Sequence, residues 1–183
     1  TKIFSKNNRD FYDDYAHHPT EIKALLKGIK NVFKKRKIIS VFQPHRYSRV
    51  SMLKKDFAES FKLADEVVLC PIYSAGEKNI NNLNQDELSN LISKHSAVQV
   101  INVKNKIELT KYLRSNLFFN ELVVSMGAGS ISSWIRSIAN ECRENWFPHV
   151  GDTAFILYLI NSKLSPDKYI RQASVKKKNK IIN

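Results

Sequence analysis

Residues that could bind a nucleotide or a metal gather in one short stretch near the start of the chain. Residues 13–21 read Asp-Asp-Tyr-Ala-His-His-Pro-Thr-Glu, so two carboxylates, a phenol and two imidazoles are close neighbours. A carboxylate can accept two hydrogen bonds from a sugar diol, and an imidazole can donate to a phosphate, stack on a base or bind a metal. Metal binding is the weaker interpretation, because adjacent histidine side chains diverge and no third ligand stands at helical spacing. The alternatives without a ligand are a helix cap at His18 and a solvated turn at Asp13.

A second stretch carries the side chains that suit an anion. Residues 41–49 read Val-Phe-Gln-Pro-His-Arg-Tyr-Ser-Arg, directly after an expected strand and at the start of an expected helix. Arg46 and Arg49 are three residues apart, so near a helix start both could face one carboxylate or phosphate and bind it in a forked way. The helix N-terminus would add backbone donors, and His45 a further donor. The alternative is a solvated basic turn.

Two more polar loops follow expected strands. The first, residues 73–77, reads Tyr-Ser-Ala-Gly-Glu, and the second, residues 126–130, reads Met-Gly-Ala-Gly-Ser. Gly127 and Gly129 permit a tight turn and the close approach of a ligand. As a dinucleotide fingerprint the second loop is weak, because Ser132 stands where the third glycine would be.

The elements that must position these loops alternate between strand and helix. The expected strands lie at 11–15, 37–42, 67–70, 98–103 and 122–126, and the expected helices at 19–33, 50–61, 86–94, 106–117 and 131–142. Several strands are continuous apolar runs, which indicates that both faces of the sheet are covered. The pattern predicts an α/β fold with a doubly wound, mainly parallel sheet and helices on both faces. Right-handed crossovers then bring the strand carboxyl ends, and the loops that follow them, to one edge where ligands bind.

Composition narrows the class of protein. Hydrophobic residues make up 43% of the 183 residues, which is enough for one domain of ordinary size with a core. The longest apolar run, Ala154–Ile160, is too short to cross a bilayer, and no signal peptide precedes the first strand, so we expect a cytoplasmic protein. Cys70 and Cys142 show no metal-ligand spacing and are expected to be reduced, packed thiols. The chain opens with Thr1, from which we expect a fragment of a longer protein.

The net charge raises the question of nucleic acid. Lys and Arg total 30 against 17 acids, a formal charge of +13. Many lysines fall on the polar faces of expected helices, however, and others form the run 176–178, so nucleic-acid binding is disfavoured. Beyond residue 145 the alternating pattern stops. Residues 146–183 are expected to form a basic appendage of unknown role, helical near 153–162.

Taken in order and at their spacing, the four motifs resemble the C-terminal domain of the Mur ligase family. The likeness covers residues 9–142, and its most discriminating part is the string Q-P-H-R-Y-x-R, which is similar to the branch that adds L-alanine to UDP-N-acetylmuramate. The resemblance implies a Rossmann-like domain over residues 1–145, the third domain of a bacterial enzyme of peptidoglycan synthesis. Its partners would be ATP, L-alanine, UDP-N-acetylmuramate and the N-terminal and central domains that this chain lacks.

The resemblance also implies a chemistry. Such ligases use ATP and Mg²⁺ to phosphorylate a carboxylate, and the amine of the amino acid then attacks the acyl phosphate. The implied ATP-binding residues are Asp13, Asp14 and His17. The implied residues of the amino-acid and acyl-phosphate side are Tyr15, His17, His45, Arg46, Arg49 and Ala128. Magnesium would be held mainly by the missing central domain, so no metal ligand and no catalytic residue is assigned to this chain alone.

Three departures from the family pattern stand out. The family usually places Asp at the position of Ser130, residues 146–183 have no recognised counterpart, and no phosphate loop G-x-x-x-x-G-K-S/T occurs. The chain by itself is therefore expected to be inactive. Two alternatives stay open: a domain of a murein peptide ligase, which the arginine string argues against, and a stand-alone basic module that binds nucleotides or nucleic acid.

Overall fold

One twisted, mainly parallel sheet organises the chain. The computed structural model describes residues 1–6, 9–79, 82–117 and 120–145. In these residues six strands pair in the order β1-β2-β6-β3-β4-β5, with β1 antiparallel to β2 and every other neighbouring pair parallel. The strands are β1 (Lys2–Lys6), β2 (Arg9–Asp14), β3 (Lys37–Phe42), β4 (Glu66–Leu69), β5 (Gln99–Asn102) and β6 (Glu121–Met126).

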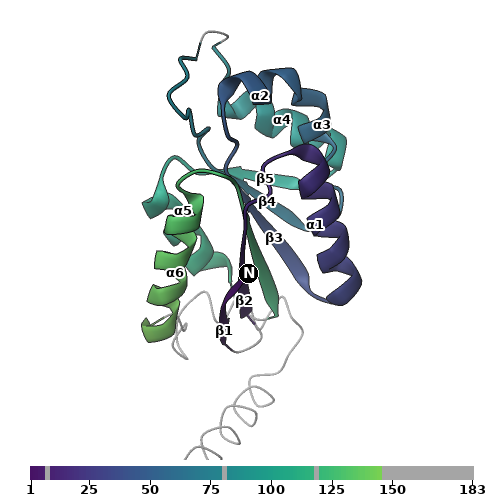
Figure 1. Ribbon diagram of the computed structural model, residues 1–183. Coiled ribbons are helices and arrows are strands. Elements are labelled where there is room, and N and C mark those ends of the chain that lie inside the picture. The colour runs from purple at the N-terminus through teal and green to yellow at the C-terminus, as the bar shows by residue number, and fades with distance from the viewer. Residues whose placement is uncertain (7–8, 80–81, 118–119, 146–183) are drawn as a thin grey trace, which may run out of the picture. The chain divides into compact units, whose positions relative to one another are not determined.

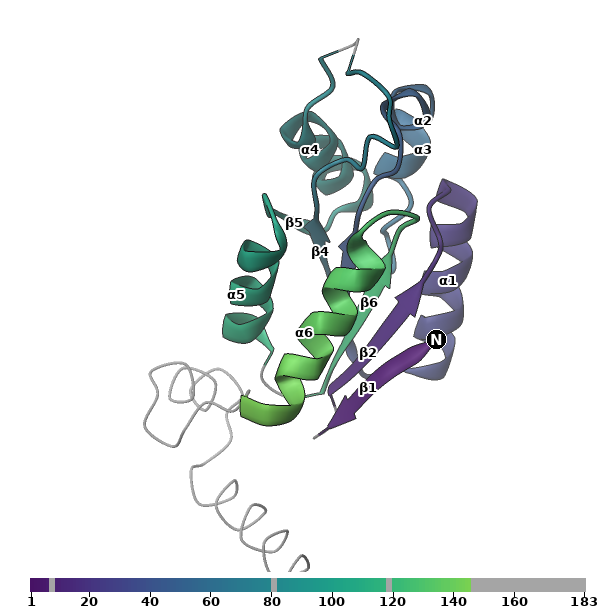
Figure 2. The ribbon, with the colours of Figure 1, turned by 60° about the vertical axis from the view of Figure 1, so that its left-hand side comes forward.

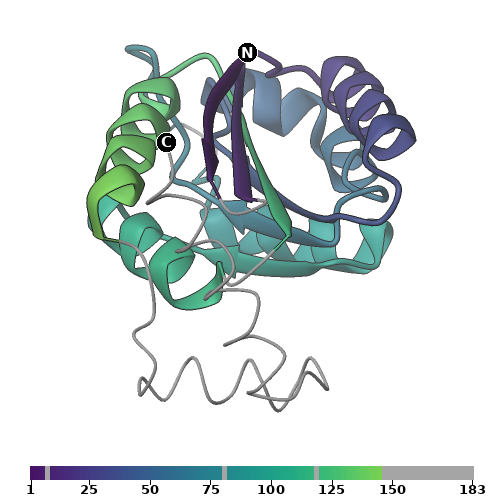
Figure 3. The same cartoon turned by 90° about the horizontal axis from the view of Figure 1, so that it is seen from below.

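Helices cover both faces of the sheet, as Figures 1 and 3 show. They are α1 (Pro19–Val32), α2 (Tyr47–Met52), α3 (Lys54–Ala58), α4 (Gln85–Ser96), α5 (Lys106–Asn116) and α6 (Ile131–Asn145). The first four pack on one face, where a continuous cluster joins Ile22 and Leu26 of α1 to Phe42 of β3 and Leu88 of α4. Helices α5 and α6 lie on the other face (Figure 2). The predicted fold class is confirmed.

One strand was not predicted, and one predicted helix is wrong. The sequence gives no sign of β1, because a short edge strand with Lys at both ends and only Phe4 buried has no clear apolar pattern. The single helix expected over 50–61 is instead the pair α2 and α3, separated at Leu53, whose φ of −108° and ψ of 22° leave the helical region. Beyond this break Phe57 and Phe61 both pack on Phe42, with ring centroids 5.6 and 5.3 Å away.

Two further expectations concern the end of the chain and membrane-spanning helices. The basic appendage 146–183 and its expected helix lie outside the described residues. Within the described ranges, no helix combines the length and the apolar character that a membrane span requires.

A buried ion pair joins the amino-terminal ends of the strands. The side chain of Arg36 donates to the carboxylate of Asp10 and, at 2.6 Å, to the backbone carbonyl of Glu121. The ammonium group of Lys2 lies 2.8 Å from the other oxygen of Asp10. Burial alone would raise the pKa of Asp10, but hydrogen bonds from Lys2, Ser5 and Arg36 outweigh burial and leave the pKa below its ordinary value. One carboxylate thus ties together β1, β2, β6 and the turn before β3.

Replacing the carboxylate of Asp10 tests whether its contacts with Lys2 and Arg36 stabilise the fold. We expect Asp10→Asn to lower the free energy of unfolding near neutral pH by about 1.5–3 kcal/mol, the usual worth of hydrogen bonds to a charged group. Because the pKa of Asp10 is lowered in the folded state, its contribution is present above the unfolded value of about 3.9 and is lost as pH falls through the folded-state pKa. Urea unfolding at a series of pH values should therefore show the gap between the native and variant chains narrowing in acid.

The exposed residue Asp56 supplies the control, since Asp56→Asn should change stability little at any pH. A gap between Asp10→Asn and the native chain that stays constant down to about pH 3 would contradict the stabilising role of the ionised carboxylate.

Candidate functional site

The sheet brings the four motifs to one edge. Asp14 at the end of β2 is level with Met126 at the end of β6, and Met126 is level with Phe42 at the end of β3. The loop 73–77 follows β4, the next strand in the sheet. The prediction that these motifs share the carboxyl edge is confirmed (Figure 1).

The two aspartates of the first motif point to opposite faces of the sheet, as neighbours in a strand do. The buried carboxylate of Asp13 faces α6, where it accepts a hydrogen bond from the Ser132 hydroxyl at 2.7 Å and lies 2.8 Å from Arg136 Nη2. The half-buried Asp14 lies on the α1 side, and its Oδ1 accepts the backbone N–H of Ala16 at 2.9 Å. Asp13 therefore anchors α6, and Asp14 shapes the turn that leads to α1.

An apolar groove lies beside Asp14, between β2 and α1. Its volume is about 390 Å³. Besides Asp14 the groove is lined by Thr1, Tyr12, Ala24, Leu25, Gly28, Ile29, Val32 and Phe33. A carboxylate at the mouth of an apolar groove can accept hydrogen bonds from a ligand whose other part is apolar.

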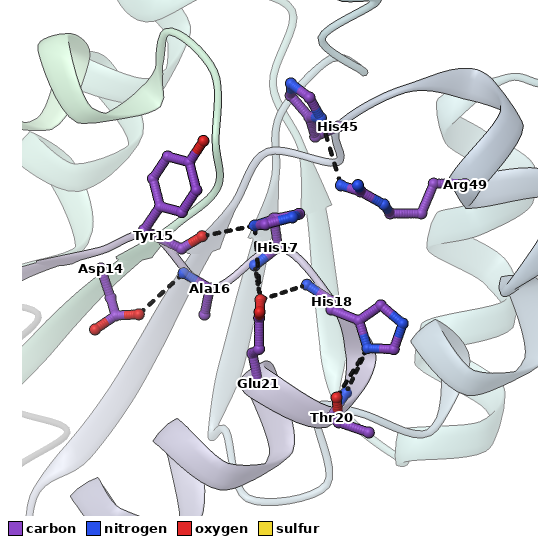
Figure 4. Close-up of polar contacts among 9 residues, drawn as sticks. All are labelled: Asp14, Tyr15, Ala16, His17, His18, Thr20, Glu21, His45 and Arg49. Atoms are coloured by element: carbon purple, nitrogen blue, oxygen red, sulfur yellow. Dashed lines mark hydrogen bonds and ion pairs between the residues drawn. The ribbon is translucent and has the colours of Figure 1, made fainter.

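The turn from β2 into α1 is fixed by its own side chains, drawn in Figure 4. One oxygen of Glu21 accepts the backbone N–H groups of both His17 and His18 at 2.9 Å, and the His18 ring accepts the N–H of Thr20, which confirms the predicted cap. The hydrogen bond from the His17 backbone is the main reason that the pKa of Glu21 is lowered. His17 Nδ1 lies 3.0 Å from the carbonyl oxygen of Tyr15, which orients the ring.

Four rings form a row across the edge: Tyr15, His17, His45 and Tyr73. Tyr15 meets His17 edge-on at 5.2 Å between centroids, and His17 meets His45 edge-on at 5.9 Å. Tyr73 stacks on His45 at 5.5 Å with only 12° between the planes. Tyr15 is 71% exposed and Tyr73 41% exposed, so the row presents its outer rings to solvent. The structure thus joins residues of the first and second motifs and adds Tyr73, to which the sequence gives no role.

The arginine string borders this row. Arg46 is exposed and precedes α2, with a φ of 69° that an L side chain rarely adopts. Arg49 is half-buried, and its Nη1 lies 3.4 Å from Nδ1 of His45 (Figure 4). Partial burial, followed by the nearby charges of Arg49, His17 and Arg46, lowers the pKa of His45. A neutral His45 ring can accept the Arg49 N–H, so the two side chains fix one another.

Gln43 connects the arginine string to the loop that opens α6. Its backbone N–H donates to the Met126 carbonyl at 3.0 Å, and its side-chain oxygen accepts the N–H of Ile131 at 3.0 Å. Its amide nitrogen donates to the Ser130 hydroxyl at 3.1 Å. The Ser130 hydroxyl is therefore engaged with Gln43. Gln43 is the first residue of the string Q-P-H-R-Y-x-R, but its role cannot be predicted from the sequence, because its partner lies 87 residues away.

The two glycines of the last motif are needed because of this close packing. A Cβ on Gly127 would lie 2.8 Å from the backbone oxygen of Gln43, and a Cβ on Gly129 would lie 2.6 Å from the Gln43 side chain and from the Tyr73 ring. Between them stands Ala128, which is half-buried. The loop therefore packs closely against Gln43 and Tyr73.

The described residues hold no group of three His, Cys, Asp or Glu side chains that could bind a metal ion. Both cysteines are free and buried, as predicted, and burial raises the pKa of each thiol to about 12.

Comparison with known proteins agrees with this geometry. Residues 1–129 match the family model described as Mur ligase, glutamate ligase domain. The UDP-N-acetylmuramate–L-alanine ligase of Pelagibacter ubique is 46% identical over 137 residues, which is 75% of this chain and 30% of that protein. The chain thus spans about three tenths of the curated relatives that it matches.

Solved structures give the same result. The crystal structure of the UDP-N-acetylmuramate–alanine ligase of Thermotoga maritima superposes with a TM-score of 0.63 at 30% identity, covering 78% of this chain and 29% of that one. A murein peptide ligase from Psychrobacter arcticus superposes with a TM-score of 0.61 over 78% of this chain and 29% of its own, but its 17% identity speaks for the fold alone. The family resemblance is confirmed, and the chain belongs to the Mur ligase family, as a glutamate ligase domain.

Proposed function

We propose that this chain is the C-terminal domain of an ATP-dependent ligase that joins L-alanine to UDP-N-acetylmuramate in the bacterial cytoplasm, during peptidoglycan synthesis. The observation that carries the proposal is the convergence of the aspartate turn, the ring row and the arginine string at one sheet edge. The names of the relatives support the choice of substrates. Because the chain spans about three tenths of those relatives, the remaining domains would supply the phosphate loop and the uridine-nucleotide site.

ATP is assigned to the aspartate turn. Asp14 borders the apolar groove and can accept hydrogen bonds from the ribose hydroxyls, and His17 follows it in the same turn. The carboxylate of Asp13 is already engaged by Ser132 and Arg136 of α6. Asp13 would therefore contribute to ATP binding indirectly, by holding α6 against the end of β2. Mg²⁺ would be held mainly by the central domain of the complete enzyme, and the described residues contain no group of three His, Cys, Asp or Glu side chains that could hold a metal ion.

The amino acid is assigned to the arginine string. A free amino acid as small as alanine must be recognised mainly by its charged ends, and a guanidinium binds a carboxylate with two parallel hydrogen bonds. The residues on this side would be Tyr15, His17, His45, Arg46, Arg49 and Ala128. Their task is to bind and orient alanine so that its amine faces the acyl phosphate, which raises the rate by proximity. The domain binds and positions, and by itself it carries out no catalytic step.

A murein peptide ligase domain is the second candidate, and the arginine string Q-P-H-R-Y-x-R argues against it. The two candidates differ in the amine or peptide that the complete enzyme accepts. Assaying the complete enzyme with alanine and with a murein tripeptide distinguishes them.

The isolated chain should form no product from ATP, L-alanine and UDP-N-acetylmuramate, because the transferring phosphate would lack its cradle. Product detection by mass spectrometry measures this, with the complete ligase as the positive control. Ligation by the purified chain alone would overturn the assignment of the chemistry to other domains.

Asp14→Ala in the complete ligase should raise KM for ATP by about ten- to a hundredfold, the effect of losing a charged hydrogen bond worth about 1.5–3 kcal/mol. KM for alanine should change much less. Steady-state kinetics with each substrate varied in turn separates the two. A larger effect on alanine than on ATP would mean that the turn belongs to the other ligand.

Arg46→Lys and Arg49→Lys keep the positive charge but lose the forked pair of hydrogen bonds. At least one of these variants should weaken kcat/KM for alanine by about tenfold or more, with little change for ATP. The thermal midpoint should barely move, because lysine keeps the charge and most of the side-chain length, and charges that solvent can reach contribute little to stability. Normal use of alanine by both variants would show that the string is structural.

A further inference from the structure

The loop after β4 is hydrogen-bonded to the turn that carries the arginine string. The backbone N–H of Tyr73 donates to the carbonyl of Pro44, and the N–H of Arg46 donates to the carbonyl of Tyr73, both at 2.8 Å. His45 and Tyr73 form an isolated parallel bridge, and their rings stack. The turn that carries the string is therefore tied by its backbone to residues that lie almost thirty positions further along the chain.

Glu77 completes this connection. Its Oε2 accepts the backbone N–H of Ser48 at 3.0 Å, and its Oε1 accepts the Ser48 hydroxyl at 2.7 Å. Ser48 is the second residue of α2, whose own N-cap residue, Arg46, makes no side-chain capping bond. Glu77 thus supplies from another loop the cap that the helix lacks.

The backbone on both sides of this contact needs such support. Arg46 has a φ of 69°, an unfavourable value for an L residue, so neighbouring bonds must hold the turn in this shape. Ala75 and Gly76 have φ values of 51° and 85°, and these two left-handed residues turn the chain so that Glu77 returns to Ser48. Hydrogen bonds from Ser48, first from its backbone and then from its side chain, lower the pKa of Glu77 and favour the ionised carboxylate.

We propose that Glu77 is a positioning residue for the amino-acid carboxylate: by holding Ser48, it fixes the turn that carries Arg46 and Arg49. The proposal rests on the function proposed above. Glu77 acts through Ser48, because both of its oxygens are engaged there. A different role would be partial neutralisation of Arg46, whose charge also acts on Glu77. The two roles predict opposite effects on the binding of an anion.

The test uses the complete ligase. Glu77→Ala should raise KM for alanine by about five- to tenfold, within the range of a lost helix cap, while KM for ATP stays within about twofold. Glu77→Gln keeps an acceptor for Ser48 and should recover part of the loss. Ser48→Ala should resemble Glu77→Ala in direction, and the double variant should be little worse than Glu77→Ala alone, because both changes break the same contact. Glu59→Ala is the matched control, since Glu59 is exposed and contacts only Lys62 among the ion pairs of the described residues.

Three results would overturn the proposal: a lower KM for alanine, which would indicate charge neutralisation; an equal rise in KM for ATP and alanine, which would indicate a general structural role; or no change in Glu77→Ala. The arginine variants separate this failure from failure of the proposed function. If Arg46→Lys or Arg49→Lys impairs alanine use and Glu77→Ala does not, only the positioning role is wrong. If both arginine variants use alanine normally, the function assigned to the string is wrong, and the role of Glu77 with it.

Discussion

The parallel pairing of β6 with β2 on one side and β3 on the other keeps the carboxyl ends of three strands level. Asp14, Met126 and Phe42 stand at the same height in the sheet, although they come from distant parts of the sequence. In β3 and β6 a charged first residue, Lys37 or Glu121, is followed by buried residues that are apolar except for one serine in each strand, and β2 buries Phe11. A slip of register would therefore move buried apolar residues out of their places in the core. The loops that follow these three strands therefore lie together at one edge of the sheet.

At this edge, a few polar contacts between residues distant in the sequence fix the positions of the loops relative to the helices. Gln43 ties the end of β3 to the first turn of α6, and Asp13 ties the end of β2 to the same helix. Glu77 ties the loop after β4 to the first turn of α2. Each of these side chains satisfies backbone N–H groups or hydroxyls that lie near a helix start, where no intrahelical partner exists. These contacts connect the start of a helix to a strand or loop that is distant in the sequence, and so they fix the turns that carry the aspartates and the arginines.

The sequence predicts the fold class because burial on both faces produces continuous apolar strands, and helix periodicity separates them. It also predicts the common edge, since strand carboxyl ends in a parallel sheet coincide. What it cannot give is contacts between loops that are far apart along the chain. Nothing local indicates that Asp13 turns toward α6 while Asp14 turns toward the groove, or that Glu77 reaches Ser48 across 29 residues. The break at Leu53 escapes prediction for a related reason: the apolar spacing continues through it, and packing on Phe42 decides where the chain turns.

The central claim is that the arginine string receives the carboxylate of the amino acid. A crystal structure of the complete ligase with L-alanine and a non-hydrolysable ATP analogue tests it most directly. The account predicts that the alanine carboxylate lies within hydrogen-bonding distance of the guanidinium group of Arg46 or Arg49, beside the ring of His45. An alanine carboxylate bound by other residues, with both guanidinium groups pointing into solvent, would contradict it.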